Sequence, residues 1–326
     1  MSRNWAFWLA GTAGVLGLAA WGTAWLFSGD AEFREQPELL EVERGEEWRL
    51  LVANDGLGMP APEEAVLAIR IGSGPVDVLD REGRVAMRIE TAGTPMAVIN
   101  EKKGLMVVSD QDWHGAWTRL LVIDMETPGV LQEIPLDGRR VSYSIFYGGG
   151  IEASEDGRWV YWIEHEWNGE RWEYGVRAVA LDSGEAADWH MPVPAECGWP
   201  ELRVHEGSAI ALGCNGQWTP ADAQRTDAEF GGQGAALRGD DYRLKLDWAR
   251  DGGSVTLRMV DPITGHVATE KQLAGTVDAY LLDTRRALVL RTDGTLERMD
   301  VWTGETEALQ HRLEGPFHAG DIALTR

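Results

Sequence analysis

The chain has 326 residues, of which 44% are hydrophobic and 25% charged, values typical of globular proteins. This length accommodates one large domain or two of ordinary size. A formal net charge of −23 would repel nucleic-acid phosphates and anionic lipid head groups, so the composition argues against nucleic acid as a partner.

The first predicted element is a transmembrane helix over residues 5–27. Trp5 to Phe27 is an uncharged stretch of 23 residues, long enough to cross a hydrocarbon core of about 30 Å. Arg3 precedes it and acidic residues follow it, which predicts a short cytoplasmic tail (1–4) and an extracytoplasmic remainder. Tryptophans suited to the membrane interface lie towards both ends: Trp5, Trp8, Trp21 and Trp25.

A cleaved signal peptide is the alternative to an uncleaved anchor. Its apolar region is usually about 7–15 residues long, and Gly22 and Ala24 offer small residues for a cleavage site. The length of the apolar stretch favours the anchor. Under either interpretation most of the chain lies outside the cytoplasm.

Residues 28–40 form a predicted linker, and residues 41–326 carry a recurring pattern of strands and turns. A hydrophobic strand ends in aspartate and a turn and a second strand follow; the marker aspartates are Asp80, Asp124, Asp182, Asp261 and Asp300. A turn and an apolar strand also precede the markers, so one unit holds four strands. Four antiparallel strands over about 40–50 residues indicate one blade of a β-propeller.

The clearest unit contains a predicted hairpin that turns at Asn168-Gly169. Asn-Gly supplies the positive φ angles of a tight hairpin turn, and both flanking runs are rich in aromatic and branched residues. A two-residue loop pairs His165 with Trp172 and Ile163 with Tyr174. This register sets Glu164 opposite Glu173, a like-charge pair that argues mildly against it.

The pattern Ser154-x-Asp156-Gly157-x-x-Val160-Tyr161, followed by a strand ending at 181–185, resembles a known superfamily. It is similar to bacterial propellers with WD-repeat-like or quinoprotein-dehydrogenase-like blades. The resemblance is best over 154–185 and partial from about 76 to 306. It implies a fold and no particular activity, and the chain lacks the regular Gly-His and Trp-Asp pairs of standard WD repeats.

The expected fold is therefore all-β: a β-propeller of four-stranded antiparallel blades after one N-terminal transmembrane helix. Six blades are favoured and five to seven are compatible with the pattern. Closure is expected to place the strand near 321–325 in one blade with strands near 48–53, because shared blades remove exposed sheet edges. Tandem β-sandwiches, which have a similar spacing of turns, are the alternative.

The tryptophans beyond the anchor, such as Trp159, Trp162 and Trp302, are expected mainly to pack between blades. The two cysteines, Cys197 and Cys214, flank a hairpin expected to turn at Glu206-Gly207. That hairpin would bring them nearly opposite each other, and in an oxidising compartment they are expected to form a disulfide. Free thiols are the alternative.

A loop at 110–119 is the main candidate binding site. It is too long for a tight turn and combines acidic and aromatic side chains: Asp110, Asp112, Trp113, His114 and Trp117. Loops on rigid scaffolds often carry function, so these residues are predicted to form a protruding contact patch. The alternative is a loop that folds back on its own blade.

The stretch 215–241 is polar and glycine-rich and is interpreted as an insertion in the propeller, suited to capping one of its mouths.

Catalytic motifs are not found. The seven histidines form neither His-x-x-x-His nor His-Glu-x-x-His, and no nucleophile elbow or phosphate-binding loop occurs. The sequence predicts no metal site and no cofactor. It favours a membrane-anchored scaffold that binds an envelope or extracellular protein or glycan. The alternative is an enzyme or enzyme subunit of quinoprotein-like dehydrogenase or carbohydrate-active type, the former by fold analogy alone.

Overall fold

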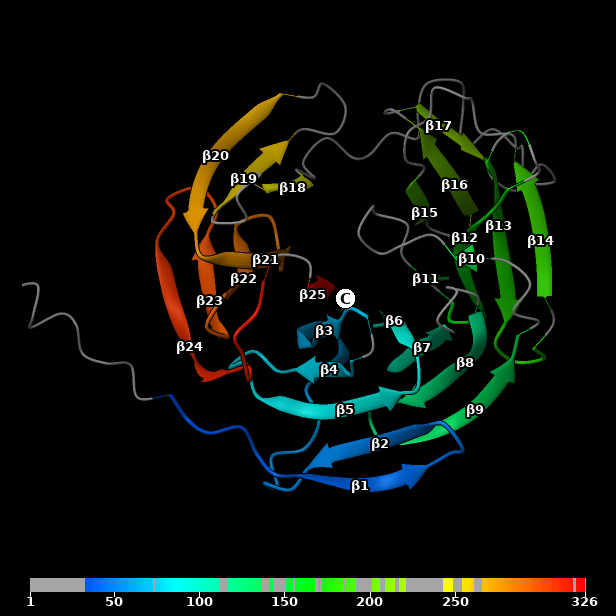
Figure 1. Ribbon diagram of the computed structural model, residues 1–326, viewed down its shortest axis with the longest axis horizontal. Coiled ribbons are helices and arrows are strands. Elements are labelled where there is room, and N and C mark those ends of the chain that lie inside the picture. Colours follow the sequence, from blue (N-terminus) through cyan, green and yellow to red (C-terminus); the bar gives the residue numbers. More distant parts are fainter. Residues whose placement is uncertain are drawn as a thin grey trace, which may run out of the picture. The chain divides into compact units, whose positions relative to one another are not determined.

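The fold is built from antiparallel β-sheets, which confirms the all-β prediction (Figure 1). The computed structural model describes residues 33–72, 74–111, 117–136, 141–142, 151–154, 156–167, 170, 172–184, 186–191, 201–205, 209–214, 217–220, 243–248, 254–260, 266–318 and 321–325. The chain divides into two units, Met1–Arg34 and Glu35–Arg326, and the strands belong to the second.

Six sheets occur among these residues. Sheet I has the strand order β1-β2-β5-β4-β3-β25 and contains β1 (Leu39–Arg44), β2 (Trp48–Ala53), β3 (Val66–Arg70), β4 (Val76–Leu79), β5 (Val85–Thr91) and β25 (Ile322–Thr325), with the short 3-10 helix η1 (Pro62–Glu64) before β3. Sheet II contains β6 (Thr94–Asn100), β7 (Leu105–Gln111), β8 (Trp117–Asp124) and β9 (Gly129–Pro135). Sheet III contains β10 (Val141–Ser142), β11 (Glu152–Ala153), β12 (Trp159–Trp167), β13 (Trp172–Ala180) and β14 (Ala186–Met191).

The remaining sheets complete the order along the chain. Sheet IV contains β15 (Glu201–His205), β16 (Ala209–Cys214) and β17 (Gln217–Pro220). Sheet V contains β18 (Arg243–Trp248), β19 (Ser254–Val260) and β20 (Val267–Ala274). Sheet VI contains β21 (Thr276–Leu281), β22 (Arg286–Arg291), β23 (Thr295–Asp300) and β24 (Thr306–Arg312). Strand β17 lies within the predicted insertion, and residues 221–241 of that insertion lie outside the described part of the chain.

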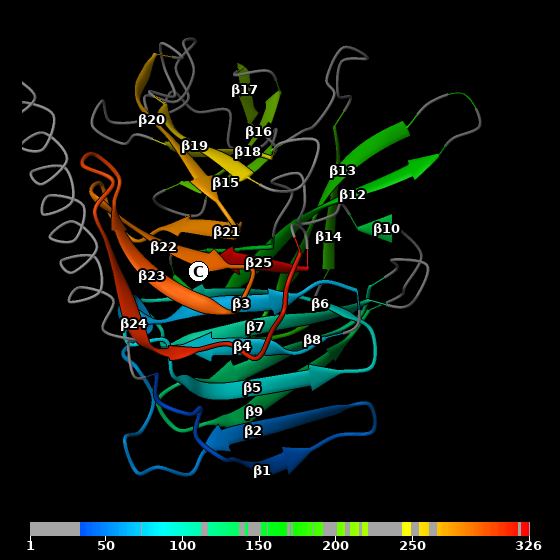
Figure 2. The same ribbon diagram turned by 60° about the vertical axis from the view of Figure 1, so that its left-hand side comes forward.

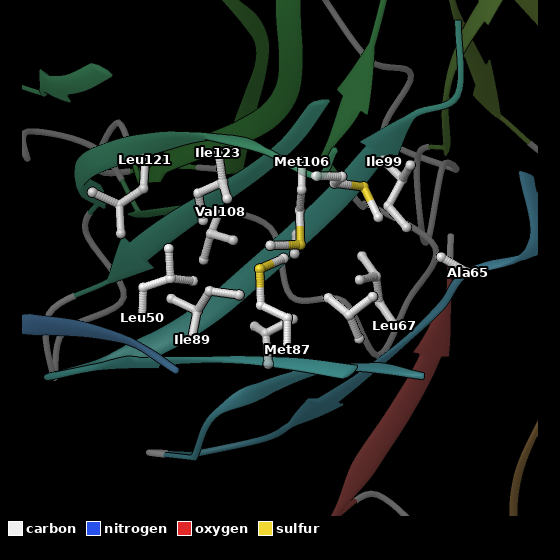
Figure 3. Packing of buried hydrophobic residues seen from close by; sticks show 14 of the residues in the cluster. Leu50, Ala65, Leu67, Met87, Ile89, Ile99, Met106, Val108, Leu121 and Ile123 are labelled. Atoms are coloured by element: carbon white, nitrogen blue, oxygen red, sulfur yellow. The ribbon is translucent and has the colours of Figure 1, made fainter. Parts of the chain in front are cut away.

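Sheet I is covered on both faces, and its apolar residues divide between them by strand alternation. In β3, Leu67 and Ile69 point towards sheet II, whereas Val66 and Ala68 point towards sheet VI. Figure 3 shows Leu67, Met87 and Ile89 packed against Met106 and Val108 of β7. Full burial of one such side chain contributes roughly 1.5–3 kcal/mol, so this interface is a main source of stability.

Other pairs of sheets that follow each other in the chain also pack against each other. One buried cluster joins sheets II and III around Trp162, and another joins sheets V and VI around Met259 and Met299. Strand β11 of sheet III also contacts β15 of sheet IV. Figure 2 shows the same sheets from a second direction. Antiparallel sheets that pack on their neighbours in chain order are the arrangement of a β-propeller, as the resemblance implied.

The last strand lies in the same sheet as the first strands, which confirms the expected closure. Strand β25 pairs antiparallel with β3, with Ile322 opposite Arg70, in the sheet that also contains β2. Ile322 and Leu324 are buried in the cluster that joins sheets I and VI. The segment before β1 is held nearby, because the Gln36 amide donates to the carbonyls of Gly83 and Arg312 and accepts from Val85 N–H.

Three of the recurring aspartates cap turns, which explains the repeat in the sequence at these positions. Oδ1 of Asp80 accepts from the N–H groups of Glu82 and Arg84 (2.8 and 3.1 Å). Asp124 and Asp300 each accept in the same way from the N–H groups two and three residues later. Such bonds hold the turn that ends one strand and starts the next. Asp261 lies outside the described residues.

The hairpin at 159–180 forms, but its predicted register was wrong by two residues. Trp167 lies opposite Trp172 and Ile163 opposite Val176, so the loop has four residues rather than two. Glu164 lies opposite Gly175, and the like-charge pair is Glu166 with Glu173. A shift of two residues keeps every side chain on its face, so alternation could not distinguish the two registers.

Burial of the tryptophans is mixed. Trp162 is fully buried, as expected for packing between sheets, whereas Trp302 is 39% exposed in a turn and donates to the Thr284 carbonyl. The predicted anchor and its tryptophans, residues 5–27, fall outside the described part of the chain. No helix within the described part is long and apolar enough to span a membrane.

Candidate functional site

A cleft of about 370 Å³ lies between sheets I and VI. Its apolar lining comes from β3, β22, β24 and the turn after β21: Val66, Leu288, Leu309 and Leu282. Its rim carries both signs of charge: Glu63, Glu64, Asp80, Arg81, Glu82, Arg286 and Arg298. The volume lies within the range of about 300–1,000 Å³ typical of ligand sites.

Two short segments of sheet I supply the acidic side of the rim. Helix η1 starts at Pro62, whose fixed φ suits the first helical position, and it presents Glu63 and Glu64. The turn after β4 presents Arg81 and Glu82. This turn needs a glycine at position 83, where φ is +79° and a Cβ would lie 2.9 Å from the His311 carbonyl oxygen.

A buried guanidinium holds the turn in place behind the cleft. The Arg84 side chain is 5% exposed, and it donates to Asp80 through Nε (2.8 Å) and to both carboxylate oxygens of Asp55 through Nη1 (3.0 Å). Its Nη2 donates to the Gly58 carbonyl (2.7 Å). Burial alone would lower the pKa of Arg84, but the bonds to the two carboxylates outweigh burial and raise it.

The guanidiniums of the rim each lie near a carboxylate. Arg286 pairs with Asp283 at 2.6 Å, Arg298 lies 3.6 Å from Glu307, and the Arg81–Glu64 distance is 4.0 Å. Arg298 Nη2 also donates to the Arg81 carbonyl (2.9 Å). This bond ties the two walls of the cleft together, because Arg298 belongs to β23 and Arg81 to the turn after β4.

The predicted loop site is only partly described. Asp110 is the last buried residue before the loop, at 3% exposed, so its side chain does not belong to a protruding patch as expected. It accepts from Gly93 N–H (3.0 Å) and lies 3.6 Å from Arg119 Nε. Burial raises the pKa of its carboxyl above the usual value. Trp117 opens β8 opposite Gln111, and Asp112, Trp113 and His114 lie outside the described residues.

A polar cluster at the seam of sheets I and II was not foreseen. Arg119 Nη1 donates to Glu133 (3.0 Å), and Arg119 also forms an ion pair with Glu47. Glu133 accepts in turn from the Trp48 indole N–H (3.1 Å). These bonds join β2, β8 and β9, and the sequence gives no signal for contacts between residues so far apart.

A partly buried acid lies at the closing seam. Oδ2 of Asp278, in β21, accepts from the Leu324 N–H of β25 at 2.7 Å. Burial raises the pKa of Asp278 to about 7, although hydrogen bonds from the N–H groups of Leu324 and Ala279 act in the opposite direction. The bond therefore links the last strand to a carboxyl that titrates near neutral pH.

The remaining sequence predictions lie partly outside the described chain. Cys214 ends β16, but Cys197 is not among the described residues, so the disulfide stays a prediction. The cysteine hairpin forms with a longer turn than expected, since His205 lies opposite Ala209. Within the described ranges, no three His, Cys, Asp or Glu residues gather in a way that could hold a metal ion.

No protein-family model and no curated protein matches the chain. Among solved structures, it is similar to the β-propeller domain of Cps50 (Swd1) from Myceliophteria thermophila, with 13% identity, TM-score 0.40, and coverage of 86% of this chain and 90% of that one. An oligogalacturonate lyase in complex with manganese matches at 12% identity and TM-score 0.39, covering 86% of each chain. BamB from Moraxella catarrhalis matches at 13% identity and TM-score 0.31, covering 83% of this chain and 64% of that one. At these TM-scores, the architecture rests on the chain's own strand pairing and core.

Proposed function

We propose that this chain is a binding scaffold: a β-propeller, favoured to have six blades, anchored to the cell membrane through residues 5–27 and placed on the extracytoplasmic side. It would bind a protein partner of the envelope or the extracellular space. The observation that carries the proposal is the cleft between sheets I and VI. Its lining combines a buried apolar floor with a charged rim, the combination found at the centre and edge of protein interfaces.

The surroundings of the cleft support a preformed site. Arg84 fixes one wall through four hydrogen bonds, and Arg298 connects that wall to the other. A rigid site loses less conformational entropy on binding, which favours affinity. The loop that contains Asp112, Trp113, His114 and Trp117 stays a second candidate contact, and the disulfide between Cys197 and Cys214 belongs to the same extracytoplasmic proposal.

Site-specific photo-crosslinking in native membranes tests the proposal. A photoreactive residue replaces Arg286, which is 57% exposed at the rim, in the intact chain. The matched control replaces Leu131, which is 61% exposed on β9 of sheet II. We expect one reproducible protein adduct at position 286 and none of that mass at position 131.

Two other outcomes would contradict the proposed site or favour the alternative function. Equal adducts at both positions would indicate non-specific contact and contradict a site at the cleft. A bound glycan or cofactor, with no protein adduct at position 286, would favour the enzyme alternative.

A further inference from the structure

The rim of the cleft carries more negative than positive charge. Four carboxylates and three guanidiniums line it. The guanidiniums of Arg286 and Arg298 lie close to two further carboxylates, Asp283 and Glu307, which are not part of the lining. The positive charges at the rim therefore already have negative neighbours, so an anionic ligand would compete with them.

Glu64 and Glu82, on the sheet I side of the cleft, have weaker partners than Asp80, which Arg84 contacts at 2.8 Å. Oε2 of Glu82 accepts from a neutral donor, the Gln310 amide, at 3.2 Å. Glu64 is 50% exposed, and its charged neighbour Arg81 is 4.0 Å away and 70% exposed. Two accessible carboxylates therefore stand on one wall, opposite the apolar residues from sheet VI.

The apolar floor of the cleft indicates a second property of the ligand, which is an aliphatic group. Leu288 and Leu309 belong to the buried cluster between sheets I and VI, and both line the cleft. Leu288 and Leu309 are each only 4% exposed, whereas Leu282 beside them is partly buried and offers the larger apolar surface for an aliphatic side chain to cover, at about 25 cal/mol per Å². Lysine and arginine suit such a place, since their stems pack on apolar surface while their charged ends reach a polar rim.

We infer that the cleft binds a cationic segment of the partner polypeptide. A Lys or Arg of that segment pairs with Glu64 and Glu82, and an aliphatic side chain of the same segment lies against Leu282. The inference rests on the proposed scaffold function and names the chemistry of the partner at this site. The net charge of −23 would also accelerate association with a basic partner.

Binding of two short peptides to the purified full-length chain tests the inference. The probes are fluorescein-labelled Leu-Lys-Leu-Lys-Leu and Leu-Glu-Leu-Glu-Leu, followed by fluorescence polarisation at physiological salt. The cleft variant is the double substitution Glu64→Lys/Glu82→Lys. The control is Glu101→Lys/Glu126→Lys, which changes the net charge equally at exposed sites on sheet II.

We expect the cationic peptide to bind, the anionic peptide not to bind, and the cleft variant to lose about tenfold in affinity for the cationic peptide. The control variant should lose much less of its affinity for the cationic peptide. Equal loss in both variants would reduce the effect to general electrostatic attraction and overturn the inference. Preference for the anionic peptide, or no binding of the cationic one, would also overturn it.

These failures are separable from failure of the proposed function. A protein adduct at position 286, without binding of the cationic peptide, would agree with the proposed scaffold function. It would contradict only the inference that the partner segment is cationic. Absence of the adduct would reject the scaffold site itself.

Discussion

Arg84 is the buried cation on which one wall of the cleft depends. Replacement by alanine leaves Asp80 and Asp55 without their common partner and the Gly58 carbonyl without its donor. Removing one member of a buried ion pair costs about 3 kcal/mol or more. We expect Arg84→Ala to lower the free energy of unfolding by about this amount, measured by urea denaturation.

The neighbouring Arg81→Ala is the matched control for this prediction. Arg81 is 70% exposed and its ion pair is loose, so the change should stay within about 0.5 kcal/mol. Arg84→Lys should fall between the two, because one ammonium cannot replace the three nitrogens that contact Asp80, Asp55 and the Gly58 carbonyl. Similar losses for Arg81→Ala and Arg84→Ala would contradict the role given to Arg84.

Asp278 makes stability depend on pH in a direction opposite to that of most acids. Its pKa is about 7 in the folded chain against an ordinary value of 3.8. Between these values the folded chain keeps a proton that the unfolded chain has released, so its contribution to stability falls as pH rises, by up to about 1.4 kcal/mol per unit. Asp278→Asn removes this titration.

The measurement is the difference in unfolding free energy between Asp278→Asn and the unaltered chain, at pH 5 and pH 8. We expect the variant to gain relative stability at pH 8, where the partly buried carboxyl of the unaltered chain is ionised. A difference that is the same at both pH values would show that Asp278 titrates normally.

At the scale of elements, the turns between strands depend on capping aspartates. Asp300 accepts from the N–H groups of Trp302 and Thr303 and from Arg285 Nε, and these bonds hold the pKa of its carboxyl at about 2. The folded pKa is lowered, so the contribution is present above pH 3.8 and is lost as pH falls towards 2.

We expect Asp300→Ala to lower the melting temperature at pH 7, and Asp300→Asn to lower it less, because the amide oxygen still accepts from the two N–H groups. Thermal unfolding followed by circular dichroism measures both. Alanine and asparagine variants with the same melting temperature would indicate that the ion pair, rather than the cap, stabilises the turn.

At the scale of the whole molecule, β25 closes the seam between sheets I and VI. Leu324 is 7% exposed and packs in the cluster that joins the two sheets. We expect Leu324→Ala to cost about 2 kcal/mol and to increase hydrogen exchange first in β3 and β21, the neighbours of β25. Faster exchange in β7 and β8 of sheet II, with β3 unchanged, would contradict this order.

The sequence was sufficient for features that depend on local pattern. Alternation and turn signals predicted antiparallel strands, the hairpin of 159–180 and the turn role of Asp80, Asp124 and Asp300. Placement of the last strand beside the first sheet followed from the need to cover sheet edges.

The sequence was insufficient where distant residues meet. Arg298 bonds to the turn at Arg81 across 217 residues, and no spacing rule links the two. The register of the hairpin could not be predicted either, because a shift of two residues leaves every side chain on the same face of the sheet. Asp110 is predicted to protrude because it begins a long loop, but β7 continues through Gln111 and the N–H of Gly93 gives Asp110 a buried partner.

The pairing of β25 with β3 has a consequence for biosynthesis. A ribosome makes a chain from its N-terminus, so β3 emerges long before the residues that cover its open edge, with Arg70 opposite Ile322. During that interval a nascent sheet I has an unpaired strand edge, the feature most prone to pair with other chains. Chaperones that bind extended edges would therefore be needed most before synthesis reaches residue 322, and least once β25 has docked.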